Sequence, residues 1–181
     1  GDGLVTPGSY DYRLTLESFS FPVNMSGMKV LDVGAATGFF SFEFEQRGAT
    51  VVATELPSID VLDRFPGESV IDTMHKLENA FRAHSVFNSS ETDTLFHAIP
   101  RDRFYYYFLD APFNFCAKTR HSQVKRKFTS IYDISPETMG DTFDMVFLGE
   151  VLLHTINPLQ ALASAASVCN GKLIISQPIS D

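Results

Sequence analysis

The chain has 181 residues, of which 44% are hydrophobic, and its formal net charge is −8. This length and composition suit one domain with a single sizeable core. The acidic balance excludes a general attraction to nucleic acid or to another polyanion. We expect neither a membrane span nor a secretory leader, and two cysteines do not make a disulfide framework. The sequence therefore predicts a cytoplasmic protein with no membrane partner.

The segment 29–40, KVLDVGAATGFF, combines a strand, a turn of small residues and the start of a helix. Residues 30–33 are apolar except for Asp32, which is typical of a strand covered on both faces. The helix predicted over 39–47 directs its free N–H groups towards the turn. The turn leaves space for a ligand beside the backbone. Its small residues, which we predict to contact a nucleotide-like cofactor, are Gly34, Ala35, Ala36 and Gly38.

Two features of this turn distinguish between possible cofactors. A dinucleotide fingerprint needs a third glycine where Phe39 stands, and it has no aspartate two residues before its first glycine. An acid at the strand end followed by G-x-x-x-G resembles the class I S-adenosylmethionine (SAM) methyltransferases, and Asp32 suits the cationic amino-acid end of SAM. The resemblance implies a Rossmann-like fold, SAM as the cofactor and methyl transfer as the activity.

The second strand, predicted over 50–54, ends in Glu55. This acid lies about 20 residues beyond the first glycine, where a ribose-binding carboxylate belongs in a βαβ unit. Its two oxygens can accept both ribose hydroxyls at once. We therefore predict that Glu55 and the adjacent Leu56 contact the cofactor. The alternative is a surface acid that caps a helix starting near Ser58.

The central block is much longer than the about 30 residues of a simple βαβ unit. Within it we predict a helical and aromatic insertion over 65–127, with a helix over 69–83 and the aromatic run FYYYF over 104–108. Such an insertion covers the substrate side of the site or forms an oligomer contact. Aromatic rings can stack a nucleobase, but a place in the core is the more common use.

A basic stretch runs over 118–127, KTRHSQVKRK, against the acidic balance of the chain. It could contact RNA phosphates in a salt-dependent way. A solvated helix end followed by a strand start is the alternative that we favour.

The third strand is predicted over 127–134 and ends in Asp133 and Ile134. By resemblance to methyltransferases, Asp133 accepts the adenine amino group and Ile134 packs on the adenine ring. The alternative is that Asp133 caps a turn leading to Pro136. A fourth strand over 143–148 passes through Gly149 and Glu150 into a predicted helix, and both residues are candidates for cofactor contact.

These elements predict an α/β fold: a Rossmann-like, doubly wound and mostly parallel sheet with helices on both faces. A helix over 158–168 and a fifth strand over 172–176 complete it. We expect one domain over 1–181, with a lead-in over 1–28, truncated after the fifth strand so that the C-terminal strands are missing. The sheet edge left open invites pairing with a second copy, which makes a homodimer an expectation.

The resemblance extends to one family in particular, the tRNA (mo5U34)-methyltransferases, which modify wobble uridine. It covers most of the chain outside the central block, in the segments 5–11, 30–43, 47–49, 130–136, 143–144, 148–154 and 157–159. It implies tRNA as a partner and carboxy-SAM as an alternative cofactor. The family usually has a tyrosine at the position of Leu153, which is thought to face the extra carboxylate of carboxy-SAM, so the leucine favours plain SAM.

The prediction is therefore a SAM-dependent methyltransferase with a small-molecule acceptor. The alternatives are a tRNA wobble-uridine enzyme and a non-catalytic SAM-binding module, and a nicotinamide oxidoreductase is disfavoured. His154 is the candidate catalytic base, with Glu150 nearby, because a histidine can accept a proton at neutral pH. A structural role for His154 is the alternative. No His or Cys cluster has metal-ligand spacing, so we expect no metal.

Overall fold

A computed structural model of the chain describes residues 12–84, 93–94 and 97–177. At its centre is a five-stranded sheet with the order β3-β2-β1-β4-β5, in which every pair of neighbours is parallel. The chain reverses its direction across the sheet between β1 and β4, which is the topological switch point of a doubly wound fold. The strands are β1 (Lys29–Val33), β2 (Thr50–Glu55), β3 (Lys125–Phe128), β4 (Phe143–Gly149) and β5 (Cys169–Ser176).

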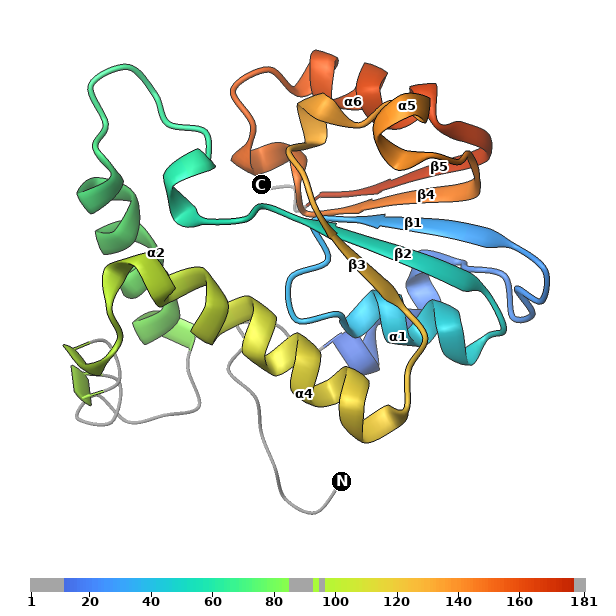
Figure 1. Ribbon diagram of the computed structural model, residues 1–181, viewed down its shortest axis with the longest axis horizontal. Helices are drawn as coiled ribbons and strands as arrows, with labels where there is room; N and C mark the ends of the chain where they lie inside the picture. Colours follow the sequence, from blue (N-terminus) through green and yellow to red (C-terminus); the bar gives the residue numbers. More distant parts are fainter. Residues whose placement is uncertain (1–11, 85–92, 95–96, 178–181) are drawn as a thin grey trace.

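Helices cover both faces of the sheet (Figure 1). One face carries α1 (Phe39–Gln46) and α4 (Ala111–Arg120), and the other carries α5 (Pro136–Met139) and α6 (Pro158–Ser167). The long helix α2 (Val70–His84) lies beyond the carboxyl ends of the strands. This arrangement confirms the predicted Rossmann-like fold. None of the described helices is long and apolar enough to cross a membrane.

The core lies in two layers on either side of β1 and β4, whose residues are almost all buried. Val146 and Leu148 face α6, where they pack against Ala161 and Ala165. Val30 and Phe147 face α1 and contact Phe44. Strands covered on both faces are continuous apolar runs, which is why the sequence pattern located these two well.

The described part of the lead-in closes the α1 face of the sheet. It contains two short 3-10 turns, η1 (Tyr12–Leu14) and η2 (Leu16–Phe19). The Phe19 ring lies 5.0 Å from that of Phe40, and the Phe21 ring lies 5.2 Å from that of Phe147, both edge to face. Residues 1–11 lie outside the described residues, and they include the segment 5–11 that resembles the tRNA (mo5U34)-methyltransferases.

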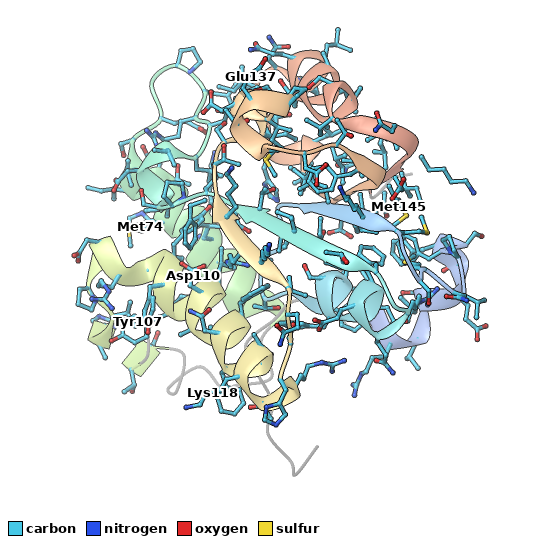
Figure 2. The ribbon with its side chains drawn as sticks, turned by 45° about the vertical axis from the view of Figure 1, so that its right-hand side comes forward. Met74, Tyr107, Asp110, Lys118, Glu137 and Met145 are labelled. Atoms are coloured by element: carbon cyan, nitrogen blue, oxygen red, sulfur yellow. The ribbon has the colours of Figure 1, made fainter. Side chains whose placement is uncertain are left out.

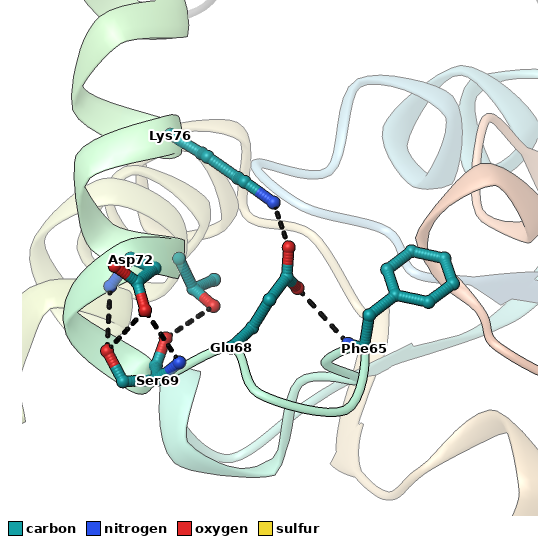
Figure 3. Close-up of polar contacts among 6 residues, drawn as sticks. Phe65, Glu68, Ser69, Asp72 and Lys76 are labelled. Carbon is teal, nitrogen blue, oxygen red and sulfur yellow. Dashed lines mark hydrogen bonds and ion pairs between the residues drawn. The ribbon is translucent and has the colours of Figure 1, made fainter.

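The insertion begins after the short turn η3 (Ile59–Val61) with a well-capped helix. In Figure 3 the Ser69 hydroxyl accepts a hydrogen bond from the Asp72 N–H at 3.2 Å, and the Asp72 carboxylate accepts one from the Ser69 N–H at 2.8 Å. This reciprocal capping satisfies two N–H groups at the helix start and fixes the first residue of α2. The predicted helix over 69–83 is found one residue later.

The rest of the described insertion is a tight helical stretch that returns the chain to the sheet. It includes the turn η4 (Arg101–Arg103) and the π-helical segment η5 (Tyr106–Asp110), which runs directly into α4. Phe104 and Phe113 are buried, whereas Tyr106, Tyr107 and Phe115 are exposed. The sequence Asn88-Ser89-Ser90 predicts a break after α2, but these residues lie outside the described ones.

Two predicted elements are wrong. The third strand ends at Phe128, and the residues expected to continue it form the 3-10 turn η6 (Ile131–Asp133), capped by the Ser130 hydroxyl. The predicted helix after the fourth strand is a single 3-10 turn, η7 (Leu152–His154). An edge strand of sequence KRKF lacks the apolar run that marks the central strands, so its position could not be read from hydrophobicity.

Candidate functional site

Two buried acids meet at the carboxyl ends of β1 and β2. Asp32 is 2% exposed and Glu55 is 9% exposed. Asp32 lies beside Ala53 in the parallel ladder, so Glu55 follows two residues further along the adjacent strand. The charge of Glu55 raises the pKa of Asp32, which shows that the two carboxylates are close enough to interact. The structure therefore brings Asp32 and Glu55 together at this edge of the sheet.

Asp32 is held by the first helix of the fold. Its Oδ2 accepts a hydrogen bond of 2.5 Å from the Ser41 hydroxyl on α1. Burial raises the pKa of Asp32 to about 6, and the Ser41 hydrogen bond and the Arg126 charge only partly oppose this rise. A cation close to this carboxylate would stabilise its ionised form.

Glu55 is held by the backbone on both sides. Its Oε2 accepts a hydrogen bond of 2.9 Å from the Ala36 N–H, and its Oε1 accepts one of 2.8 Å from the Leu56 N–H. Burial raises the pKa of Glu55, against the lowering by these hydrogen bonds and by Arg126. Each carboxylate oxygen can accept more than one hydrogen bond, so each keeps a lone pair for a further donor.

The glycines of the turn serve the protein's own packing, which differs from the expected open approach for a ligand. Gly34 and Gly38 have φ angles of 68° and 89°, a region that favours glycine. A Cβ at Gly34 would lie 2.6 Å from Cγ2 of Val151, and one at Gly38 would lie 2.6 Å from the Phe113 ring. Ala35 is buried and donates its N–H to the Thr54 carbonyl at 2.9 Å.

Arg126 completes this cluster, and sequence reasoning missed it. It lies on β3, and its Nη1 donates a hydrogen bond of 2.9 Å to the Ala36 carbonyl of the turn. The same guanidinium forms an ion pair with Asp110, at 2.7 Å from Nη2 to Oδ1. In the sequence, Arg126 is one of several cations in the basic stretch over 118–127. The alternation of side chains along a strand separates Arg126 from Lys125 and Lys127, and this period of two was the available signal.

The structure does not bring Asp133 into this cluster. Its side chain is exposed on η6, whereas Ile134 is 2% exposed and packs in the α6-side core with Val33 and Leu148. The alternative prediction for Asp133, a cap for the turn leading to Pro136, is wrong, because Ser135 is the N-cap of α5. Ile134 is therefore a core residue, and its contact with an adenine ring stays a prediction.

The loop after β4 lies beside the turn. Val151 fills the space next to Gly34, and the backbone at Gly149 ends the strand. Glu150 has a φ of 56°, and its N–H donates to the Ser176 carbonyl at 2.7 Å. His154 is exposed, yet desolvation by nearby protein atoms lowers its pKa, against the charge of Glu150, which raises it. Within the described residues, no group of three His, Cys, Asp or Glu side chains could hold a metal ion.

Solved structures of other proteins share this fold. The chain is similar to the [4+2]-cyclase SpnF, with 16% identity and a TM-score of 0.53, over 91% of this chain and 44% of that one. It is also similar to the PH0226 protein of Pyrococcus horikoshii OT3, with 19% identity and a TM-score of 0.52, over 92% of this chain and 51% of that one. Both likenesses establish the fold. The chain spans about half the length of these proteins.

The sequence itself identifies the family. Residues 9–181 match the methyltransferase domain family, and the chain belongs to it. Coclaurine N-methyltransferase, solved with N-methylheliamine and S-adenosylhomocysteine bound, shares the fold with a TM-score of 0.50 and 15% identity, over 91% of this chain and 34% of that one. No match was found among curated proteins. The predicted methyltransferase class is confirmed.

Proposed function

We propose that this chain binds SAM between the β1–α1 turn and Glu55 and transfers its methyl group to a small-molecule acceptor. One observation carries the proposal: two interacting carboxylates, Asp32 and Glu55, are buried at adjacent strand ends of a methyltransferase domain. Buried acids need a compensating partner. The cationic amino-acid end and the ribose hydroxyls of SAM supply this partner.

The residues of the site divide these tasks. Asp32 attracts the cationic end of the cofactor, and Glu55 accepts the ribose hydroxyls at its remaining lone pairs. The turn over 34–38 holds the cofactor against α1, with Leu56 and the Gly149–Glu150 backbone as flanking contacts. The sulfonium of bound SAM supplies an activated methyl group, so the chain's task is alignment and exclusion of water. His154, whose lowered pKa keeps it neutral at pH 7, accepts the proton of the acceptor.

The charge of the surface favours a small acceptor. The chain has a net charge of −8, which disfavours binding of a polyanion such as RNA. Within the basic stretch, Arg126 is buried in an ion pair with Asp110 and so offers no charge to an RNA phosphate. Lys127 also contacts the Thr138 carbonyl. Lys118, Arg120 and Lys125 are exposed, and they support tRNA as the second candidate acceptor.

Titration calorimetry with SAM, carboxy-SAM and NADH tests the cofactor. We expect SAM to bind at one site per chain, carboxy-SAM to bind no better, and NADH not to bind. Binding of NADH without binding of SAM would contradict the proposal.

A transfer assay with methyl-labelled SAM tests the acceptor, using the protein with a small-molecule extract and with total tRNA. We expect label in the small-molecule fraction, and lower transfer by the His154→Gln variant at unchanged SAM affinity. Label in tRNA alone would replace the small-molecule proposal with the tRNA one. SAM binding without transfer to either pool would leave a non-catalytic SAM-binding module and refute the proposed activity.

A further inference from the structure

Arg126 occupies an unusual place for an arginine on an edge strand. Its side chain is 8% exposed, and that of Asp110, its ion-pair partner, is 11% exposed. Both Nε and Nη2 donate to Asp110 Oδ1, at 3.1 and 2.7 Å, while Nη1 points the other way to the Ala36 carbonyl at 2.9 Å. One guanidinium therefore joins Asp110, at the end of η5, to the turn over 34–38, which we call the cofactor turn.

Ala36 is held from both sides by this arrangement. Arg126 binds its carbonyl, and Glu55 binds its N–H at 2.9 Å. Its φ of 46° lies in the left-handed region, which a residue with a Cβ adopts only where its surroundings hold it. The turn that we assign to SAM thus owes its shape to contacts with β2 and β3.

The insertion holds the other end of the same turn through α4. The Phe113 ring packs so closely on Gly38 that it leaves no space for a Cβ, and it lies 5.1 Å from the Phe42 ring. The Arg126 guanidinium stacks on Phe113 at 4.2 Å from the ring centre. Figure 2 shows Asp110 at the end of α4 that lies near β3, with Lys118 at the far end of the helix. Both anchors of the turn therefore come from one short stretch of chain.

Arg126 also sets the charge around the turn. The other groups that interact with the two acids are Ser41, which donates a hydrogen bond to Asp32, and Asp110 and Tyr105, which interact with Glu55. Arg126 lowers the pKa of both Asp32 and Glu55, whereas Asp110 raises that of Glu55. Burial and the charge of Glu55 raise the pKa of Tyr105, so this phenol stays neutral. Arg126 is thus a cation that favours the ionised form of both acids and partly opposes the effect of their burial.

We propose that Arg126 and Asp110 are positioning residues through which the insertion holds the cofactor turn in its binding conformation. The inference rests on the proposed SAM site, and it assigns the insertion a role in cofactor binding in addition to any cover it provides for the acceptor. Arg126 acts through Ala36 and through the charge of the acids, and it does not touch the reacting atoms.

Hydrogen exchange of the ligand-free protein tests the mechanical part of the proposal. In Arg126→Gln, the amides of Ala36 and Gly38 should exchange about tenfold faster or more, the effect of losing a hydrogen bond to a charged group. The control is Lys125→Gln, which removes the same charge from an exposed position on the same strand and should leave these amides unchanged. Unchanged exchange in Arg126→Gln would overturn the proposal.

The pH dependence of SAM affinity tests the electrostatic part. We expect Arg126→Gln to weaken SAM binding about tenfold or more, by loss of a charged hydrogen-bond partner. The midpoint of the affinity profile should also move to higher pH, because the cation that lowers the pKa of both acids is gone. A role in packing alone would leave the midpoint where the wild type has it, and that result would refute the electrostatic claim.

Arg126→Lys decides the question if Arg126→Gln does not fold. Lysine keeps the charge but cannot reach Asp110 and Ala36 with separate N–H groups of one planar fork. We expect an unchanged midpoint, with faster exchange at Ala36 and weaker SAM binding than in Lys125→Gln. If Arg126→Lys matched Lys125→Gln in both Ala36 exchange and SAM affinity, the inference would be overturned. A wild type that binds no SAM would refute the proposed function. The hydrogen-exchange measurement needs no SAM, so it would still test whether Arg126 holds the turn.

Discussion

The buried position of Asp32 disfavours the ionised form of its carboxyl group. Burial raises its pKa from 3.8 to about 6, and the Ser41 hydroxyl and the Arg126 charge offset only part of this. Because the folded-state pKa lies above the unfolded one, the folded chain binds the proton more tightly, and stability falls as the pH rises from about 4 to about 6. A difference of about 2 pKa units corresponds to a loss of about 3 kcal/mol at neutral pH.

We therefore expect Asp32→Asn to stabilise the protein at pH 7.5 by about 1–3 kcal/mol, since asparagine keeps an oxygen for Ser41 and carries no buried charge. The gain should shrink towards pH 4, where the wild-type acid is protonated. Urea denaturation at several pH values measures it, with the exposed Asp133→Asn as the control. A variant less stable than the wild type at pH 7.5 would show that a partner more than compensates the charge. Weaker SAM binding in the same variant would show why the acid is kept.

Among the elements, the central strands and the amphipathic helix α6 are predicted to within about a residue or two, the usual limit for boundaries. The strand predicted over 50–54 is found as Thr50–Glu55, and the helix predicted over 158–168 as Pro158–Ser167. β3 was misplaced because a charged edge strand has no apolar run, and because Ile131 and Ile134, buried in a turn, imitate a strand. Local pattern does not distinguish burial in a turn from burial in a strand.

The candidate site was predicted only where its residues end a central strand. Asp32 and Glu55 follow apolar runs, so their place at the carboxyl edge followed from the fold class. Arg126 and Asp110 come from β3 and from the end of η5, and they meet only because the insertion folds back on the sheet. A contact between a charge in a basic stretch and an acid in an aromatic run has no signature in hydrophobic pattern, so it required the structure.

The packing of α4 on the cofactor turn lets us predict the effect of a substitution at Gly38. Gly38→Ala should destabilise the protein by about 2–5 kcal/mol, combining the left-handed φ with the overlap of the new Cβ and the Phe113 ring. Gly140→Ala is a matched control, because Gly140 has a φ of 72° with nothing within 4 Å of its Cβ position. This control should lose only the about 1–2 kcal/mol of backbone strain. Equal losses in urea denaturation would mean that Phe113 moves aside freely.

At the scale of the whole molecule, the site exists only in the folded state. Asp32 and Glu55 are 23 positions apart in the sequence numbering and become neighbours through the pairing of β1 with β2. The turn between them is held by Arg126, from the edge strand β3 next to β2. A ligand that needs all of these groups binds the folded chain and not the unfolded one, so its binding must raise the stability of the fold.

SAM at 100 times its dissociation constant should therefore stabilise the chain by about 2.7 kcal/mol. For a domain of this size, this free energy corresponds to a rise in Tm of about 5–10 °C. At the same SAM concentration Glu55→Gln should gain only about half as much, because losing a charged acceptor for the ribose weakens binding about tenfold. Glu137→Gln makes the same substitution at an exposed acid on α5 and should keep the full rise. Differential scanning calorimetry measures all three proteins, and an equal rise in each would show that SAM binds away from Glu55.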